Sequence, residues 1–246
     1  MRRCDPNGLS DPPRLVDAAT NISPAYTHIH LKAVPKPTSL TGNFTWSTNS
    51  GTISLTNTSA QDVIVNASAT PSNSVGAESV SVLFTPSTSS SAATSTHNLT
   101  VVHCIFTAYA DNSDSIGHGW WSYSIEPLAA LSLVSPPSLR AWSNIEIGYY
   151  PIIHVPAWVD GFVVVGPQGE HRPTSTHPWD IPFSGVTAGF TAGLSYSQAL
   201  SVNPGSYNVG LHNCCHETIA AAAACGVSIP ASCWTPNSLH IYLSGL

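Results

Sequence analysis

A cysteine and a histidine in the second half of this 246-residue chain are the side chains best suited to do chemistry. Cys214 follows Asn213 and comes shortly before a run of alanines at 220–224. Asparagine is a favoured N-cap and alanine is the strongest helix former, so the pattern predicts a helix whose first residue is Cys214. The free backbone N–H groups and the dipole of that helix favour the thiolate, the nucleophilic form of cysteine.

His118 is the candidate base for this thiol. It lies between Gly117 and Gly119 near the start of a predicted strand, where its small neighbours leave the imidazole unobstructed. An imidazole in that position can take the thiol proton and later return it to a leaving group. A buried structural cysteine and a histidine with a local partner are the alternatives, because free cysteine is often buried and the chain has 11 histidines.

A metal site is the competing interpretation of the same segment. Four potential ligands fall within residues 212–216, and His212 and His216 have the i,i+4 spacing of a helical zinc pair. However, His212 precedes the predicted N-cap, and no C-x-x-C pair completes a structural zinc site. We therefore expect a reactive thiol, with no metal and no cofactor.

The other cysteines have structural interpretations. Cys215 lies about 100° round the predicted helix from Cys214, so we expect it to be packed or oxidised rather than catalytic. In an exported protein, a disulfide bridge could form among Cys104, Cys225 and Cys233. The spacing of the cysteines leaves the connectivity of such a bridge open.

The elements that must position the candidate residues are mostly strands. Alternating and aromatic runs predict strands at 117–124, 145–151, 161–165 and 207–211, and a short helix at 195–202. Residues 166–184 are rich in Pro and His and are expected to form a loop over a cleft, or a substrate lid. The candidate substrate-binding residues are Trp120, Tyr149, His177 and Trp179.

The first half of the chain differs in composition and in its pattern of apolar residues. Residues 41–100 contain no Lys or Arg, and Asp62 and Glu78 are their only acids. Short period-2 runs rich in Thr, Val and Ile recur there with turn residues between them, which is typical of an all-β sandwich. We predict this sandwich over 27–103, after a Pro-rich linker or tail at 1–26.

Composition excludes several classes of partner. Only 8% of the residues are charged, the net charge is -6, and Lys and Arg number 7. Binding to nucleic acid or to an anionic membrane surface needs clustered basic side chains, so neither is expected. The chain has no 18-residue apolar run and hence no predicted transmembrane segment. No signal peptide is evident at its start, so export would use another route or the sequence is a fragment.

Several motifs together resemble a known family. Residues 104–246 are similar to the circularly permuted papain-like cysteine hydrolases, relatives of the NlpC-type cell-wall peptidases and of lecithin–retinol acyltransferase. The segments that carry the resemblance are Gly117-His118, Asn213-Cys214, Gly226 with Pro230, and Pro236-Asn237-Ser238-Leu239. In the first half, residues 46–51 followed by Ile53 resemble bacterial immunoglobulin-like domains of surface proteins.

The family resemblance implies a fold and a set of roles. It implies an α+β domain at 104–246, with a papain-like antiparallel sheet and a central helix. Cys214 would be the nucleophile, His118 the base, and the backbone N–H of Cys214 the oxyanion donor. A third, orienting residue would lie on the strand after the histidine, where Glu146 is preferred; Asn144 and His154 are its alternatives.

The sequence thus predicts a thiol-dependent hydrolase or acyltransferase of the peptidase or amidase type. It would act on an amide or ester bond through a Cys–His pair, and by analogy its substrate would be a peptide, a cell-wall component or a lipid. The expected location is extracellular or at the cell surface. The alternative is a non-catalytic surface protein that binds or supports other molecules, and a zinc-binding domain is a weaker one.

Overall fold

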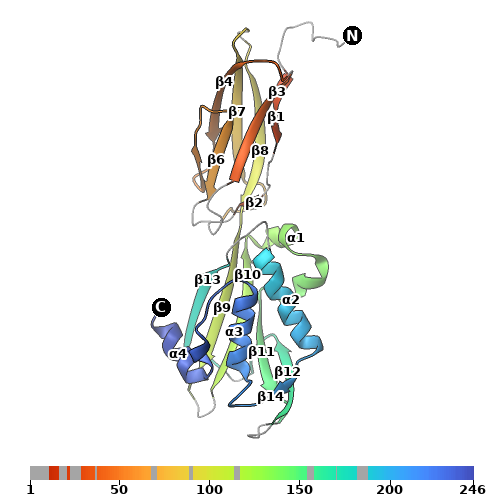
Figure 1. Cartoon of the computed structure of the whole chain (residues 1–246), viewed down its shortest axis with the longest axis vertical. Coiled ribbons are helices and arrows are strands. Elements are labelled where there is room, and N and C mark those ends of the chain that lie inside the picture. Colours follow the sequence, from red (N-terminus) through yellow and green to blue (C-terminus); the bar gives the residue numbers. More distant parts are fainter. Residues whose placement is uncertain are drawn as a thin grey trace. The chain divides into compact units, whose positions relative to one another are not determined.

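The computed structural model describes residues 11–16, 21–22, 29–36, 38–67, 71–88, 91–113, 117–153, 158–169, 171–181 and 188–246. The chain divides into two compact units, Met1–Val102 and His103–Leu246 (Figure 1). The boundary predicted from the sequence, between residues 103 and 104, is one residue later. The protein is a β-rich α+β protein, because antiparallel sheets dominate both units and helices are few.

The first unit contains two four-stranded sheets, with strand orders β1-β3-β6-β5 and β2-β8-β7-β4. Their strands are β1 (Asp11–Val16), β2 (Asn21–Ile22), β3 (Ile29–Lys36), β4 (Gly42–Thr48), β5 (Ile53–Thr56), β6 (Asp62–Ala67), β7 (Glu78–Pro86) and β8 (Ala93–Val101). Inward-facing residues of both sheets form one hydrophobic cluster, which includes Leu31, Trp46, Val63, Val82 and Leu99. The predicted period-2 pattern is therefore the pattern of this core.

The prediction that residues 1–26 form a linker or tail is wrong for part of that segment. β1 pairs with β3 in an antiparallel ladder, and β2 pairs with β8 in a parallel one. The sequence suggested turns because of Pro12 and Pro13. However, β1 is the edge strand of its sheet, where proline is tolerated because one row of N–H groups needs no partner, and its register shifts between Asp11 and Arg14.

The second unit is built on one six-stranded antiparallel sheet with strand order β13-β9-β10-β11-β12-β14. Its strands are β9 (His103–Asp111), β10 (His118–Glu126), β11 (Ile145–Pro151), β12 (Val159–Val165), β13 (Ser175–Asp180) and β14 (Ser206–Tyr207). Its helices are α1 (Leu131–Val134), α2 (Ala188–Val202), α3 (Cys214–Ala224) and α4 (Pro236–Ser244), with short 3-10 turns at Leu128–Ala130, Pro137–Trp142 and Ala231–Cys233.

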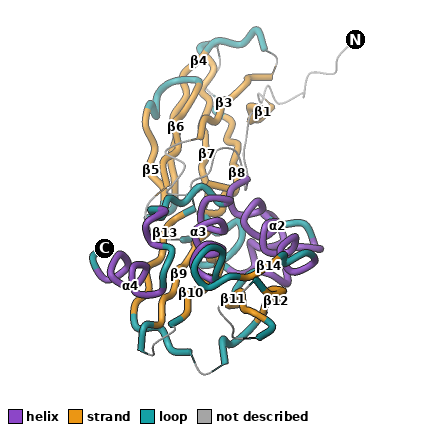
Figure 2. The backbone as a smooth tube through the Cα atoms, turned by 60° about the horizontal axis from the view of Figure 1, so that its bottom comes forward, coloured by secondary structure: helices purple, strands orange, loops and turns teal. Residues whose placement is uncertain are grey.

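Helices α2, α3 and α4 cover one face of this sheet (Figures 1 and 2). Trp121 of β10 points to this face, because its indole Nε1–H donates to Ser197 Oγ of α2 at 3.1 Å. Gly119 lies on the same face against α3. Since neighbouring residues of a strand point to opposite faces, His118 and Trp120 point to the other face.

Helix α3 begins and ends as its sequence predicts. The Asn213 side chain accepts hydrogen bonds from the backbone N–H groups of Cys215 and His216, at 2.9 and 3.3 Å, and the His216 ring accepts one from the Asn213 N–H. This is a capping box. Gly226 follows the C-cap residue with a φ of 83°, a conformation that glycine adopts without strain.

Three other local predictions differ from the structure. The expected loop at 166–184 contains strand β13, which pairs with β9 along the edge of the sheet. Helix α2 begins at Ala188, well before the expected 195. The expected strand at 207–211 ends at Tyr207, and a turn closed by the Asn208–His212 bridge follows it.

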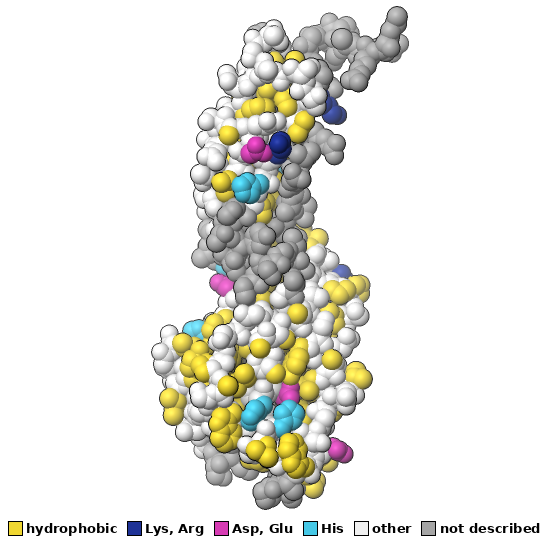
Figure 3. Space-filling model, in the orientation of Figure 1, with side chains coloured by type: hydrophobic (Ala, Val, Ile, Leu, Met, Phe, Trp, Pro, Cys, Tyr) yellow, Lys and Arg dark blue, Asp and Glu magenta, His cyan; other side chains and the backbone are white. Residues whose placement is uncertain are grey.

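The surface carries few charges. Figure 3 shows one face of the molecule, on which uncharged polar and hydrophobic side chains prevail and Lys, Arg, Asp and Glu are sparse. No helix in the described part of the chain combines the length and the hydrophobicity needed to cross a bilayer.

Candidate active site

The candidate site forms where β10 and β11 separate. The two strands pair from Trp120↔Gly148 to Tyr123↔Ile145, and Gly119 lies just before the first of these pairs. The backbone N–H of Gly119 donates to the Cys214 sulfur at 3.4 Å. Cys214, the first residue of helix α3, therefore places its thiol at the end of the β10–β11 ladder, next to His118.

The environment of Cys214 favours its thiolate. A hydrogen bond with the Cys215 thiol is the largest cause that holds the pKa of Cys214 well below its ordinary value. Burial opposes this effect, whereas the charge of His118, a hydrogen bond with its imidazole and the Gly119 N–H add to it. Cys214 is only 2% exposed, so these nearby groups replace water as the partners of the sulfur.

The other described thiols are not activated. Burial raises the pKa of Cys104 and of Cys233, and it raises that of Cys225 to about 12. The hydrogen bond with Cys214, together with burial, raises the pKa of Cys215. The anticipated bridge among Cys104, Cys225 and Cys233 is absent, since all five described cysteines are free. Cys4 lies outside the described residues.

His118 is held by aromatic rings. Its imidazole stacks on Tyr150, with ring centroids 4.2 Å apart, and on Trp120 at 5.6 Å. The ring of His171 approaches it to 4.7 Å. His118 is 3% exposed, and its Nε2 atom has no hydrogen-bond partner among the described residues. Stacking thus fixes the plane of the imidazole, and its Nε2 atom forms no hydrogen bond with the described residues.

A buried carboxylate lies behind these rings. Asp111 is paired with His118 across β9 and β10, and its Oδ2 lies 3.1 Å from His171 Nδ1. Burial would raise the pKa of Asp111, but hydrogen bonds from Ser113, His171 and the Arg172 N–H lower it to about 2. His171 thus stands between an ionised carboxylate and the candidate base.

The third residue expected from the resemblance is not beside His118. Glu146 pairs with Ser122, several positions along the strand, and Trp120 separates it from His118. Asn144 lies at the start of β11, with its side chain accepting from the Ile125 N–H at 3.5 Å. His154 lies outside the described residues. The sequence shows neither the parity nor the register of β11, so it could not show that Glu146 lies opposite Ser122 rather than His118.

Tyr150 occupies the position on β11 that faces His118. Its hydroxyl lies 3.1 Å from Gln168 Oε1, and Gln168 Nε2 donates to the Gly166 carbonyl at 2.5 Å. Gly148 makes room for this arrangement, because a Cβ at that position would lie 1.9 Å from Gln168 Oε1. Burial is the first cause that raises the pKa of Tyr150, so its hydroxyl stays protonated.

The four predicted substrate-binding residues separate into different places. Trp120 is fully buried and lines a pocket described below. Tyr149 points away from His118, and its hydroxyl donates to the Pro204 carbonyl at 2.9 Å. His177 and Trp179 lie on the edge strand β13, with their rings 4.5 Å apart. The structure therefore brings only Trp120 into contact with His118.

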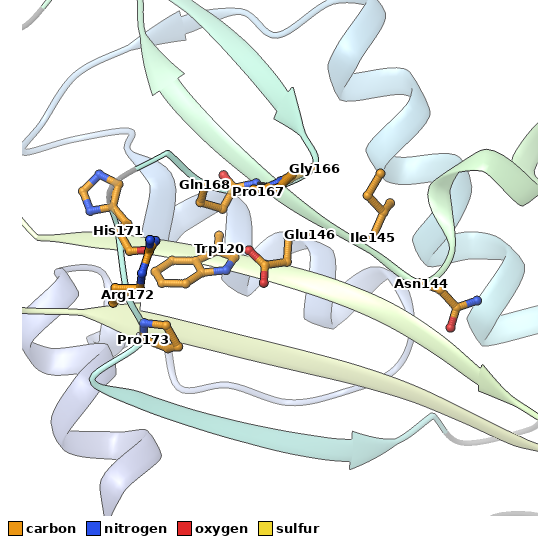
Figure 4. A pocket seen from close by; sticks show the side chains of 10 residues that line it. All are labelled: Trp120, Asn144, Ile145, Glu146, Gly166, Pro167, Gln168, His171, Arg172 and Pro173. Atoms are coloured by element: carbon orange, nitrogen blue, oxygen red, sulfur yellow. Dashed lines mark hydrogen bonds between the residues drawn. The ribbon is translucent and has the colours of Figure 1, made fainter.

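A pocket of about 340 Å³ opens on the sheet face that the helices do not cover (Figure 4). Trp120 and Glu146 of the sheet line it, together with Gln168, His171 and Arg172 from the segment between β12 and β13. Trp120 and His171 also contact His118, so the pocket adjoins the Cys–His pair.

The predicted oxyanion donor already has a partner. The hydroxyl of Tyr207 is hydrogen-bonded to the Cys214 backbone N–H and to the Cys214 side chain, and burial is the main cause that raises the pKa of Tyr207. An oxyanion formed at Cys214 would therefore meet the Tyr207 hydroxyl as well as the N–H group. Tyr207 was not among the predicted site residues, although it lies only seven residues before Cys214 in the sequence.

The metal interpretation finds no geometric support. No group of three or more His, Cys, Asp or Glu side chains is placed to hold a metal ion in the described part of the chain. His212 Nε2 instead lies 2.5 Å from Glu217, and its Nδ1 lies 2.6 Å from the Ser206 carbonyl. The His216 ring belongs to the capping box of α3.

Comparisons with known proteins add little to this description. No protein-family model matches the chain, and neither does any curated protein. A solved structure that is similar is that of a nucleoside hydrolase-related hypothetical protein from Saccharophagus degradans that is associated with carbohydrate metabolism. The two are 17% identical with a TM-score of 0.27, over 39% of this chain and 26% of that chain. The match thus spans about a quarter of that protein, and so low a score carries no conclusion about fold or function.

Proposed function

We propose that the second unit is a thiol-dependent hydrolase or acyltransferase that acts on an amide or ester bond. The observation that carries this proposal is the setting of Cys214, whose sulfur meets His118, the Gly119 N–H and the Cys215 thiol at the first residue of a helix. Among the five described cysteines, only Cys214 has a lowered pKa. A thiolate next to an imidazole is the arrangement that nucleophilic cysteine catalysis requires.

The reaction would proceed through an acyl-thioester. His118 takes the proton of the Cys214 thiol, and the sulfur attacks the carbonyl carbon of the substrate. The Tyr207 hydroxyl and the Cys214 N–H stabilise the resulting oxyanion. The tetrahedral intermediate collapses when the carbon–nitrogen or carbon–oxygen bond breaks, and His118 returns the proton to the departing amine or alcohol. Water or another acceptor then releases the acyl group.

The fold-level part of the proposal is that the second unit is a permuted papain-like domain and the first an immunoglobulin-like sandwich. An antiparallel sheet that carries the histidine ahead of a helix opening with Asn-Cys supports the former. Two sheets around a single core support the latter. A peptide, cell-wall or lipid substrate and an extracellular or cell-surface location follow by analogy alone.

Selective alkylation tests this function. The whole chain is treated with a limiting amount of iodoacetamide at pH 7, and the modified cysteines are located by mass spectrometry. We expect label to accumulate on Cys214 first, and to be lost from that position in Cys214→Ser. The His118→Ala variant should label Cys214 more slowly, while the labelling of Cys233 stays unchanged. Uniform slow labelling of all cysteines would refute the proposal.

A non-catalytic surface protein is the second candidate, and burial favours it. Cys214 and His118 are 2% and 3% exposed, so a substrate must displace covering groups before it reaches them. In a binding protein the same pair would serve only to pack the start of α3. That function predicts no difference in alkylation rate at Cys214 between the native protein and the His118→Ala variant.

A further inference from the structure

The lining of the pocket beside the Cys–His pair includes a hydrogen-bond donor that has no acceptor among the described residues. The indole Nε1–H of Trp120 is completely buried and has no partner among the described residues. Leaving such a donor unsatisfied costs about 1–3 kcal/mol, so buried donors are normally paired. An unpaired one in the wall of a pocket points to a bound group that accepts a hydrogen bond.

The indole is fixed in place by its neighbours. The Trp120 ring stacks on Tyr109, with centroids 5.3 Å apart and planes 9° apart, and on His118 at 5.6 Å and 14°. Because two rings stack on it, the indole cannot turn its N–H toward another protein acceptor without breaking these stacks. The donor is therefore held at a defined position in the wall of the pocket.

The same pocket supplies an acceptor. Figure 4 shows the Glu146 side chain next to the Trp120 indole among the residues that line the pocket. Glu146 forms no ion pair with any described residue. Arg172, the other fully charged lining residue, donates to the Gly169 and His171 carbonyls at 3.2 and 3.0 Å. One fixed N–H donor thus stands beside one carboxylate that lacks a cationic partner.

We propose that this pocket is a subsite for a carboxamide group. The carbonyl oxygen of the amide accepts from Trp120 Nε1–H, and an amide N–H donates to the Glu146 carboxylate. A carboxylate ligand has no hydrogen to donate to Glu146 and would be repelled by it, although Arg172 in the same lining would attract it. A bare ammonium would leave the indole N–H unpaired, and a hydrocarbon chain would satisfy neither group. A volume of about 340 Å³ accommodates a carboxamide and the carbons attached to it.

The location gives this subsite a role in substrate selection. Trp120 and His171 line the pocket and also contact His118. A carboxamide bound in the pocket would therefore be separated from the His118 imidazole by a single side-chain ring. The substrate would then carry a carboxamide near the bond that Cys214 attacks. This role rests on the proposed function, whereas the binding of a carboxamide does not.

Indole N–H resonances of the full chain labelled with ¹⁵N-tryptophan provide a direct test. The seven tryptophans give one resonance each, and Trp120→Phe identifies that of Trp120. The probes are propanamide, propanoate and propylammonium, titrated separately. We expect propanamide to shift the Trp120 resonance downfield in a saturable manner, and the other two probes to bind at least about fivefold more weakly.

Glu146→Ala should weaken the binding of propanamide at least about fivefold, whereas Glu126→Ala, at the exposed end of the neighbouring strand β10, should leave it unchanged. If Trp120→Phe fails to fold, the dependence of a single responding resonance on Glu146 identifies it instead. Equal binding of all three probes, tighter binding of propanoate, or no saturable shift would overturn the proposal. Because the titration needs no turnover, its failure is distinct from uniform cysteine alkylation, which would refute the proposed enzyme.

Discussion

The pH dependence of Cys214 alkylation is the sharpest prediction, and replacement of His118 is the perturbation that tests it. His118 lowers the pKa of Cys214 through its charge and its hydrogen bond. Thiolate is the reactive species, so a lowered pKa keeps the alkylation rate high at mildly acidic pH. We expect the native Cys214 rate to vary by less than about tenfold between pH 6 and pH 8.5.

The magnitude follows from ordinary thiol ionisation. A cysteine with a pKa of about 8.5 is roughly 0.3% ionised at pH 6 and half ionised at pH 8.5, so its rate rises about 150-fold over this range. Removing His118 should make the Cys214 profile steeper, because the pKa of Cys214 rises when the His118 charge and hydrogen bond are lost. A rise of one pKa unit, about 1.4 kcal/mol, changes the ratio of the two rates by at most about tenfold. The ratio of rates at two pH values is informative because slow access to a buried sulfur cancels in it.

The assay is a set of stopped iodoacetamide reactions, analysed by the mass of the peptide that contains Cys214. His118→Ala is compared with His240→Ala, whose ring contacts Thr174 in the native protein, and with His118→Gln as a less disruptive replacement. A profile of equal steepness in the native protein and both His118 variants would refute the electrostatic coupling. A native profile as steep as that of an ordinary thiol would do the same.

Three further outcomes are expected. Cys215→Ala should steepen the Cys214 profile because it removes the largest cause of the lowered pKa, while Cys215→Ser should preserve it; the same alkylation assay decides. Gly119→Ala should reduce the free energy of unfolding by roughly 1–3 kcal/mol in urea titrations, because its Cβ would lie 2.9 Å from Cys215 Sγ, whereas Gly51→Ala, with no heavy atom within 4 Å, should be neutral. Asp111 has a pKa lowered to about 2, so its stabilisation is present above about pH 4 and is lost as the pH falls toward 2. In urea titrations, Asp111→Asn should remove roughly 1–2 kcal/mol from the difference between the free energies of unfolding at pH 5 and at pH 2. The same difference in the native protein and the variant would contradict this prediction.

The sequence predicted those elements whose signals are local. The start of α3 was clear because Asn213 and the alanine run act within one helical turn. β13 was missed because its alternation contains Pro178, which fits only at the edge of a sheet, and edge position is a property of the assembled sheet. The same reason explains the missed β1 strand.

The parts of the candidate site were predictable to different degrees. Cys214 and His118 were predicted from the residue types, their immediate neighbours and the combination of motifs that carries the family resemblance. The surroundings of His118 were not, because the positions of Tyr150 and His171 depend on the register of β11 and on the path of the segment between β12 and β13. Choosing Glu146 as the orienting residue required a strand parity that only the ladder with β10 reveals.

The burial of the Cys214 sulfur has a consequence for the fate of an acyl group attached to it. A thioester enclosed by the Tyr207 and His118 side chains would be reached by few water molecules, so spontaneous hydrolysis would be slow. An amine or alcohol that enters along the pocket would then compete well with water. Such a chamber would direct the chemistry toward transfer between two bound molecules rather than toward simple cleavage.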